Sequence, residues 1–276
     1  MAAGDFIAPE VYADLAQAEF TGKVKVLGSP AVLEDNTLEG QPGETISFPK
    51  WGALGELADL TVGVAMTPTE LEQTDSSATI KEAGKAVVIN DRDKLTMLGG
   101  TNGAQSETFR QFGILAARKV DGDLITEART AAGLTDTTAA GVTTFGLAAV
   151  NTAFALFGDD CEPEDFAGIY IHADQLGEAF ASQDFVDASK VGDNSLIRRG
   201  VVGTIRGVPV TVSNRLTTGE VLLMKQRVLG ALYKRRPLIE QDRDILKRQD
   251  VITTNVHYAV KAVTPSGIAL VTLAAA

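Results

Sequence analysis

Three pairs of aspartates have a spacing at which carboxylates can do chemistry. Two such groups can share a proton or bind a divalent cation. The pairs are Asp91/Asp93, Asp121/Asp123 and Asp242/Asp244. Each is interleaved with arginine or glycine, and none is followed by the further oxygen ligands of a calcium-binding loop. We therefore expect solvated faces or salt bridges at these pairs rather than a catalytic or metal site.

The two histidines and the cysteine add no stronger candidate. His172 and His257 are far apart, and neither has a cysteine or a second histidine at the spacing of a metal site. Cys161 is the only cysteine, so no intramolecular disulfide can form. The chain also lacks the glycine-rich phosphate-binding patterns and the G-x-S-x-G pattern of hydrolases. The sequence predicts no enzyme, no catalytic residue, no cofactor and no bound metal.

Composition and charge restrict the class of protein further. The 276 residues, of which 45% are hydrophobic, can bury a substantial core. A net charge of −11 argues against wrapping nucleic acid, because that mode needs clustered Lys and Arg. The basic residues are dispersed, apart from Arg198-Arg199 and the run Lys234-Arg235-Arg236. No stretch approaches the length of a membrane span, so we expect a soluble protein with no membrane partner.

The longest regular element that the sequence predicts is a helix over residues 106–132. Hydrophobic residues recur there at three- and four-residue steps and so share one face. Ser106 can cap the start of the helix, and Gly133 offers a left-handed stop. The opposite face has no cluster of groups that could do chemistry, so we expect a structural spine. The core face comprises Phe109, Phe112, Ala116, Val120 and Leu124.

The chain before this helix is interpreted as an arm followed by a ribbon. Residues 1–43 carry too little apolar surface to fold alone and should lie on other parts of the structure. Within them we expect a short amphipathic segment at 9–20 and a short strand at 24–27. Residues 44–90 are expected to leave and rejoin the body as a long two-stranded excursion. An isolated ribbon is marginal in water, so this one should rest on neighbours.

Strand-like and helical segments alternate between residues 140 and 240, which predicts an α/β layer. One hairpin of this layer is expected over 201–214 and turns at Arg206-Gly207, because glycine readily supplies a positive φ. Residues 237–250 are densely charged and should connect the layer back to the spine. A closing hairpin of two strands is expected over 251–273. The other elements expected in the layer are helices at 145–157 and 174–182 and strands at 166–171 and 221–224.

Mixed charges along the arm and the ribbon suggest contacts with other subunits. Exposed ion pairs are worth only about 0–1 kcal/mol each, and solvated charges explain any single one equally well. A symmetric assembly would repeat such contacts many times. The candidates for subunit contacts are Glu34, Asp35, Glu39, Lys50, Trp51, the glutamate Glu56 beside Leu57, Lys81, Glu82 and Lys85.

The order of these elements resembles a known family. An arm is followed by a ribbon (GETISFPKW and SATIKEAGKAVVIND), the spine helix, an α/β layer containing GTIRGVPVTVSN, the segment KQRVLGALYKRRPLIEQDRD and the closing VITTNVHYAVKAVTPSGIALVTL. This order is similar to that of major capsid proteins of tailed bacteriophages with the HK97-type fold, an α+β fold. The resemblance covers nearly the whole chain. Its motifs are turns and strands rather than catalytic signatures.

The resemblance implies a division into four parts. Residues 1–43 would be an N-terminal arm and residues 44–90 an extended loop. A peripheral domain would combine residues 91–139, including the spine helix, with residues 241–276. An axial domain would occupy residues 140–240.

The resemblance also implies function and partners. Subunits would form pentamers and hexamers and assemble into an icosahedral procapsid that expands on maturation and encloses double-stranded DNA without reading its sequence. We expect a separate scaffolding protein, a portal and a cement or decoration protein. The protein would assemble in the cytoplasm of a host bacterium and end in the virion capsid.

Some relatives cross-link a loop lysine to an asparagine of another subunit with the help of a glutamate. Lys50, Lys81 and Lys85 lie in the expected loop, but we find no match for the asparagine and the glutamate, so the reaction is not carried over. Two other classes remain as alternatives. One is an encapsulin-type nanocompartment shell, whose cargo-binding first helix is not recognisable here. The other is an α/β enzyme, for which Asp242 and Asp244 would be the first residues to test.

Overall fold

The computed structural model describes residues 25–35, 43–96, 100–136, 142–181 and 203–274, except 53, 56, 58, 60–62, 64 and 67. The expected amphipathic segment at 9–20, the candidate Glu39 and the pair Arg198-Arg199 lie outside the described residues.

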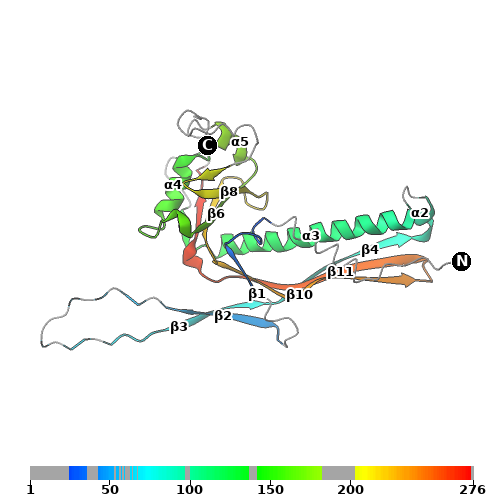
Figure 1. Cartoon of the computed structure of the whole chain (residues 1–276), viewed down its shortest axis with the longest axis horizontal. Helices are drawn as coiled ribbons and strands as arrows, with labels where there is room; N and C mark the ends of the chain where they lie inside the picture. The colour runs from blue at the N-terminus through cyan, green and yellow to red at the C-terminus, as the bar shows by residue number, and fades with distance from the viewer. Residues whose placement is uncertain are drawn as a thin grey trace.

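The described residues form three β-sheets and four α-helices, one of which is much longer than the others (Figure 1). The first sheet has the order β1-β10-β11-β4, the second β5-β12-β9-β6-β8-β7, and the third is the ribbon β2-β3. The strands are β1 Val32–Asp35, β2 Thr45–Trp51, β3 Gln73–Thr79, β4 Lys81–Asn90, β5 Leu134–Asp136, β6 Phe166–Ile171, β7 Thr204–Ile205, β8 Val208–Val212, β9 Glu220–Lys225, β10 Leu229–Asp244, β11 Gln249–Ala262 and β12 Ile268–Thr272. The α-helices are α2 Asp91–Thr96, α3 Gly100–Thr130, α4 Leu147–Ala155 and α5 Gln175–Ala181.

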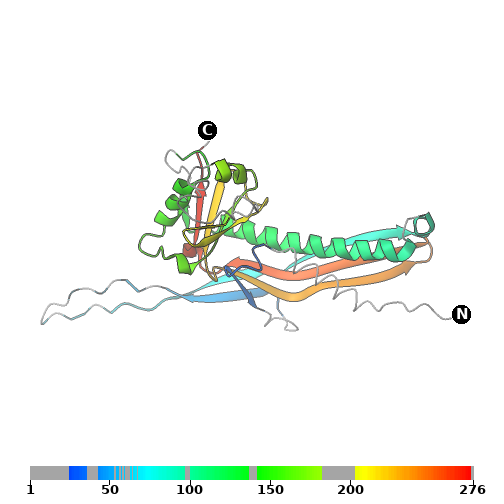
Figure 2. The same cartoon turned by 45° about the horizontal axis from the view of Figure 1, so that its top comes forward.

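The four-stranded sheet is built on the long antiparallel pair β10–β11, which runs from Leu229↔Ala262 to Asp244↔Gln249. Figure 2 shows α3 lying along this sheet. Phe109 and Phe112 of the helix pack on Ile89, Ile239 and Ile252, one from each of the three longest strands. The apolar face of the helix and the alternating strand residues thus form one core.

The six-stranded sheet is covered on both faces, which explains why every residue of β6 is buried. Ile169 and Ile171 belong to the core that includes α4, whereas Tyr170 belongs to the core that includes the C-terminal half of α3. Successive strand residues point to opposite faces of a sheet. A strand that is apolar at every position therefore suits this central place.

Several predicted elements are present. The helix over 106–132 corresponds to α3, the helices at 145–157 and 174–182 to α4 and α5, and the strands at 166–171 and 221–224 to β6 and β9. The hairpin at 201–214 is β7–β8, and its turn has positive φ at both Arg206 (53°) and Gly207 (83°). Positive φ at both central residues is the geometry of a type I′ hairpin turn.

Both predicted ends of the spine helix are wrong. The helix begins at Gly100, so Ser106 lies inside it rather than at its cap. Gly133 is not in the left-handed region. Its backbone N–H donates to the Pro265 carbonyl at 2.9 Å, and a Cβ there would lie 2.7 Å from that carbonyl group. The glycine is required by close packing of two backbones rather than by a helix stop.

Four further expectations about strands are wrong. The chain over 251–273 is not a hairpin, because β11 pairs with β10 and β4 whereas β12 pairs with β9 and β5. The two-stranded ribbon ends at Thr79, and β4 instead pairs with β11 from Lys81↔Tyr258 to Asn90↔Gln249. Residues 237–244 are the outer half of β10 rather than a connection. Residues 25–31 form turns, and the strand of this segment is β1.

Candidate functional site

The ribbon β2–β3 projects away from the rest of the chain in both views (Figures 1 and 2). Only its base is packed, where Ile46 and Ala78 contact the buried residues Leu232 and Ala259. Beyond the base the described apolar side chains are exposed, with Leu57 at 101%. Exposed apolar groups that gather on one projecting element are a candidate surface for contact with another molecule. The exposed members are Trp51, Leu54, Leu57, Met66 and Leu71.

The start of the described chain is held on the spine helix by a buried carboxylate. Asp121 is 6% exposed, and its Oδ1 accepts the backbone N–H groups of Lys25 at 3.2 Å and Val26 at 2.8 Å. Val26 and Ala31 are fully buried beside it. A carboxylate that satisfies two backbone donors is a structural anchor. Asp121 therefore fixes residues 25 and 26 on the spine helix.

Asp123, two residues later, holds the helix on β11. Its carboxylate accepts a hydrogen bond from the Lys119 Nζ at 2.8 Å and one from the Tyr258 hydroxyl at 2.8 Å. Burial alone would raise the pKa of Asp123, but these two hydrogen bonds outweigh it and hold the pKa below its usual value. Burial and the same carboxylate raise the pKa of Tyr258. The pair Asp121/Asp123 is thus structural.

Replacing Asp123 with asparagine should lower the free energy of unfolding of the chain by about 1 kcal/mol at neutral pH, since a charged hydrogen-bond acceptor is lost. A carboxyl whose pKa is lowered by folding stabilises above its unfolded pKa, and the contribution is lost as pH falls through the folded pKa. The difference between wild type and Asp123→Asn should therefore shrink below about pH 4. Urea unfolding at several pH values measures it, with the exposed Asp59→Asn as control. A difference that stays constant into acid would contradict this assignment.

A second carboxylate network lies at the far end of the long sheet, around Lys94 of α2. The Lys94 Nζ lies 3.1 Å from Asp91 and 2.6 Å from Asp250, and Arg243 lies 2.8 Å from Asp91. The hydrogen bond from Lys94, supported by the charge of Arg243, lowers the pKa of Asp91. Burial opposes the charge of Lys94, but hydrogen bonds to Asp250 and Asp91 outweigh it and raise its pKa. Asp93 accepts a hydrogen bond from Asn90 at 3.1 Å and does not complete a metal site.

The third pair shapes the turn between β10 and β11. Asp242 accepts the backbone N–H of Arg243, and Asp244 accepts those of Leu246 and Lys247. Such local bonds are typical of aspartate in turns. Among the residues that the structure describes, no three His, Cys, Asp or Glu side chains are grouped as metal ligands would be.

The histidines and the cysteine are likewise placed in structural roles. His172 Nδ1 lies 3.2 Å from Asp174 Oδ2. His257 Nε2 lies 3.6 Å from Glu82 Oε1. Cys161 is half-buried and packs against the core of the six-stranded sheet.

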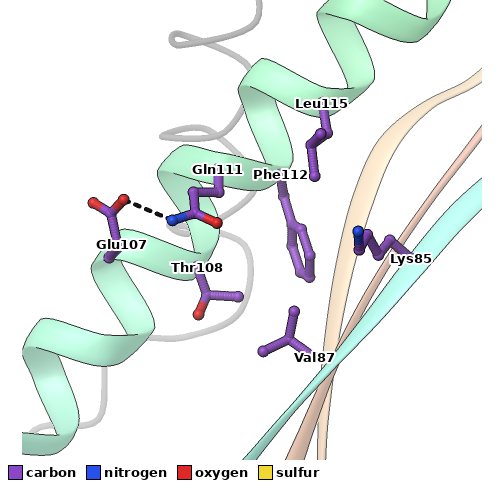
Figure 3. A pocket seen from close by; sticks show the side chains of 7 residues that line it. All are labelled: Lys85, Val87, Glu107, Thr108, Gln111, Phe112 and Leu115. Atoms are coloured by element: carbon purple, nitrogen blue, oxygen red, sulfur yellow. Dashed lines mark hydrogen bonds between the residues drawn. The ribbon is translucent and has the colours of Figure 1, made fainter.

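A shallow groove of about 110 Å³ lies between α3 and β4. Figure 3 shows Phe112 pointing from the helix toward Val87, with Lys85 beside it, while Glu107 and Gln111 bond to each other on the helix. The groove has an apolar floor and no convergent set of catalytic groups. No described helix is both long and apolar enough to cross a membrane.

The structure spreads the predicted contact residues over several surfaces. Glu34 and Asp35 lie on β1, Lys50 and Trp51 at the outer end of β2, and Lys81, Glu82 and Lys85 along β4, whereas Glu56 lies outside the described residues. They do not form one site. Of the predicted core face, Phe109, Phe112, Val120 and Leu124 are at most 2% exposed, and Ala116 is half-buried. The candidates rested on charge apart from Trp51, so they missed the exposed apolar residues Leu54, Met66 and Leu71.

This geometry, a projecting ribbon on a body that is otherwise structural, matches what comparison with known proteins finds. The family model described as phage capsid protein matches residues 73–271. The chain belongs to the phage capsid protein family. It is 30% identical, over 91% of its length and 88% of the relative, to the major capsid protein of Staphylococcus phage phiMR11. This capsid protein is therefore a structural component of the oligomeric shell of a phage and is located in the virion capsid.

Solved structures agree on the fold of this capsid protein. A chain of Mycobacterium phage Che8 superposes with a TM-score of 0.67 at 16% identity, covering 91% of this chain and 90% of the other. A chain of the cyanophage Pam1 capsid asymmetric unit gives 0.66 at 14% identity, covering 99% and 94%. The α+β arrangement of sheets, spine helix and ribbon is thus the one found in phage capsids.

Proposed function

We propose that this capsid protein assembles through pentamers and hexamers into a closed icosahedral shell around packaged double-stranded DNA. The observation that carries the proposal is the ribbon, whose exposed apolar residues are covered by no described part of the chain. A second subunit beneath the ribbon removes this apolar surface from water. Closed symmetry then repeats the same contact in every subunit.

The parts of the subunit take the roles of an HK97-type fold in this proposal. The four-stranded sheet with α2 and α3 forms the peripheral domain, and the six-stranded sheet with α4 and α5 forms the axial domain around the five- and six-fold axes. The strand β12 goes with the axial domain because it pairs with β9. Residues 1–43 are the arm, and residues 44–79 are the extended loop.

The charge of the protein fits a container rather than a DNA-binding protein. A net charge of −11 avoids tight binding of phosphates, which would hinder packaging and ejection. We propose that assembly takes place in the cytoplasm of the host bacterium with a separate scaffolding protein, a portal and a cement or decoration protein. The shell forms as a procapsid and expands on maturation. The protein has no catalytic role in this scheme.

We propose that the charged candidates along the arm and β4 contribute at the rim of subunit contacts. Glu34, Asp35, Lys81 and Lys85 carry charges at the surface of the long sheet, where neighbouring peripheral domains would meet. Each pair contributes little alone, about 0–1 kcal/mol. The apolar loop residues Trp51 and Leu57 supply the larger share through burial.

Deletion of the loop tests the proposal. Replacing residues 52–72 with a two-residue Asn-Gly turn should leave β2 and β3 joined as a short hairpin and the subunit folded. We expect size-exclusion chromatography and negative-stain electron microscopy to show closed shells or capsomers for wild type and only unassembled subunits for the variant. A variant that still forms normal shells would refute the role of the loop. A wild-type chain that stays a monomer or dimer under every condition would refute shell assembly.

Nucleic-acid content separates this proposal from an encapsulin-type nanocompartment. Particles purified from infected cells should contain double-stranded DNA. Shells that enclose a protein cargo instead would favour the nanocompartment.

A further inference from the structure

The middle of β10 carries a run of three cations that the packing of the subunit does not require. Tyr233 pairs with Tyr258, and Leu238 pairs with Asn255. The stretch of β10 between these pairs is two residues longer than the stretch of β11, so β10 contains two β-bulges. A bulge breaks the strict alternation of side chains along a strand. As a result Arg235 and Arg236 are both exposed. We call Lys234, Arg235 and Arg236 the basic bulge.

The cations of the basic bulge contact neutral groups only. Lys234 Nζ donates to the Gly43 carbonyl, and Arg235 Nη2 donates to Asn255 Oδ1 at 2.6 Å. The Arg236 guanidinium lies 5.8 Å from the centre of the Tyr233 ring. Within the described part of the chain, no carboxylate forms an ion pair with any of the three. The positive charges of the basic bulge are therefore available to pair with another molecule.

The loop beyond the ribbon has the opposite charge. We call residues 52–72 the acidic loop, because this stretch contains four carboxylates and no lysine, arginine or histidine. Glu70 and Glu72 are exposed, as is Asp59. In the described residues none of these three forms an ion pair. The acidic loop thus combines unpaired negative charge with the exposed apolar residues Leu54, Leu57 and Met66.

The two surfaces do not meet within one subunit in this structure (Figure 2). The contact of Lys234 with Gly43 places the basic bulge beside the base of the ribbon. The ribbon points away from that base (Figure 2), and its acidic loop begins only beyond the pair Trp51↔Gln73. Charge complementarity therefore calls for a second copy of the chain.

We propose that the basic bulge of one subunit receives the acidic loop of a neighbouring subunit. This inference rests on the proposed shell assembly and names the surface on which the loop lies. Opposite charges steer the loop to its place and reject wrong registers, while the apolar residues of the loop are buried between the subunits. Exposed ion pairs are weak one by one, and repetition around each capsomer makes them effective.

A charge swap tests the proposal. One variant changes Glu56, Asp59, Glu70 and Glu72 to lysine, and a second carries Arg235→Glu and Arg236→Glu. We expect each variant to fold, as judged by circular dichroism, and to lose closed shells in electron microscopy. The chain that combines both sets should regain shells, because the charges are complementary again. A control with Arg118→Glu and Arg227→Glu changes the net charge equally at two other exposed sites and should assemble like wild type.

Several results would overturn the proposal. Normal shells from the Arg235→Glu/Arg236→Glu variant would refute it. It would also be refuted if both variants fold but the chain that combines their substitutions does not form shells. Normal shells with reduced DNA content would assign the basic bulge to phosphate binding instead. If a charge-reversal variant does not fold, Arg235→Gln/Arg236→Gln serves in its place. Shell assembly by this variant should depend less on salt concentration than assembly by wild type. An unchanged salt dependence of assembly would refute the contact. Wild-type protein is assembled in parallel. If wild type forms shells, a loss of shells in a variant concerns the proposed contact; if wild type forms none, the proposed shell assembly itself has failed.

Discussion

Replacing Phe112 with aspartate is expected to abolish soluble folding of the subunit. Phe112 is 2% exposed and packs between the spine helix and the long sheet with Ile89, Ile239 and Ile252. Loss of the ring costs about 3–5 kcal/mol, and burying a carboxylate in its place adds several more. The total is comparable to the whole stability of a domain, about 5–15 kcal/mol. Soluble yield and far-ultraviolet circular dichroism measure the outcome.

The matched control is Leu115→Asp, one turn further along the same helix. Leu115 is 40% exposed, so a carboxylate there stays in water. We expect this variant to be soluble and helical, with a stability close to wild type. If Phe112→Asp were also soluble and fully helical, the core face of the helix would be assigned wrongly.

Replacing Lys94 with methionine is expected to destabilise the unassembled subunit by about 3–5 kcal/mol, because it removes one partner of a buried ion pair. The side chains of Lys94 and Asp250 are each only 10% exposed. The Oδ1 atom of Asp250 is buried and has no hydrogen-bond partner among the described residues, so Asp250 depends on the ammonium group through Oδ2. The midpoint of urea unfolding measures the change.

Two further variants separate the burial of a charge from other causes. Lys119→Met removes an exposed lysine from its ion pair with Asp123 and should cost about 1 kcal/mol or less. Adding Asp250→Asn to Lys94→Met removes the unpaired charge and should recover part of the loss. A double variant that is less stable than Lys94→Met would show that the ion pair is not the source of the effect.

Elements with local signals could be predicted from the sequence. The spacing of Phe109, Phe112, Val120 and Leu124 depends only on the period of the helix itself, and the turn at Arg206-Gly207 depends only on backbone preference. The pairing of β4 with β11 and of β12 with β9 depends on partners far away in the sequence. A strand's own pattern does not name such a partner, so the closing hairpin was predicted wrongly.

For the candidate site too, features with a local signal could be predicted and features that depend on tertiary contacts could not. The aspartate pairs were predicted to be solvated or salt-bridged because they lack the other ligands of a metal site. For Asp121 this was wrong, because it is buried and accepts the backbone N–H groups of Lys25 and Val26, a role that depends on tertiary contacts. The acidic composition of residues 52–72 can be read directly from the sequence. The bulge that exposes Arg235 and Arg236 could not be predicted, because it arises from a mismatch in register with β11.

The connections between the two large sheets have a mechanical consequence. The chain crosses between them three times, at residues 131–133, 226–228 and 263–267. Gly133 donates to Pro265, and Val263 donates to Val228, so all three crossings are bonded to one another side by side. The core also runs across the joint, because Tyr170 and Leu222 of the six-stranded sheet are buried in one cluster with Tyr258 of the four-stranded sheet. The two sheets should therefore behave as one stiff body, so that differences in curvature between positions in a shell are taken up by the projecting ribbon and by the contacts between subunits.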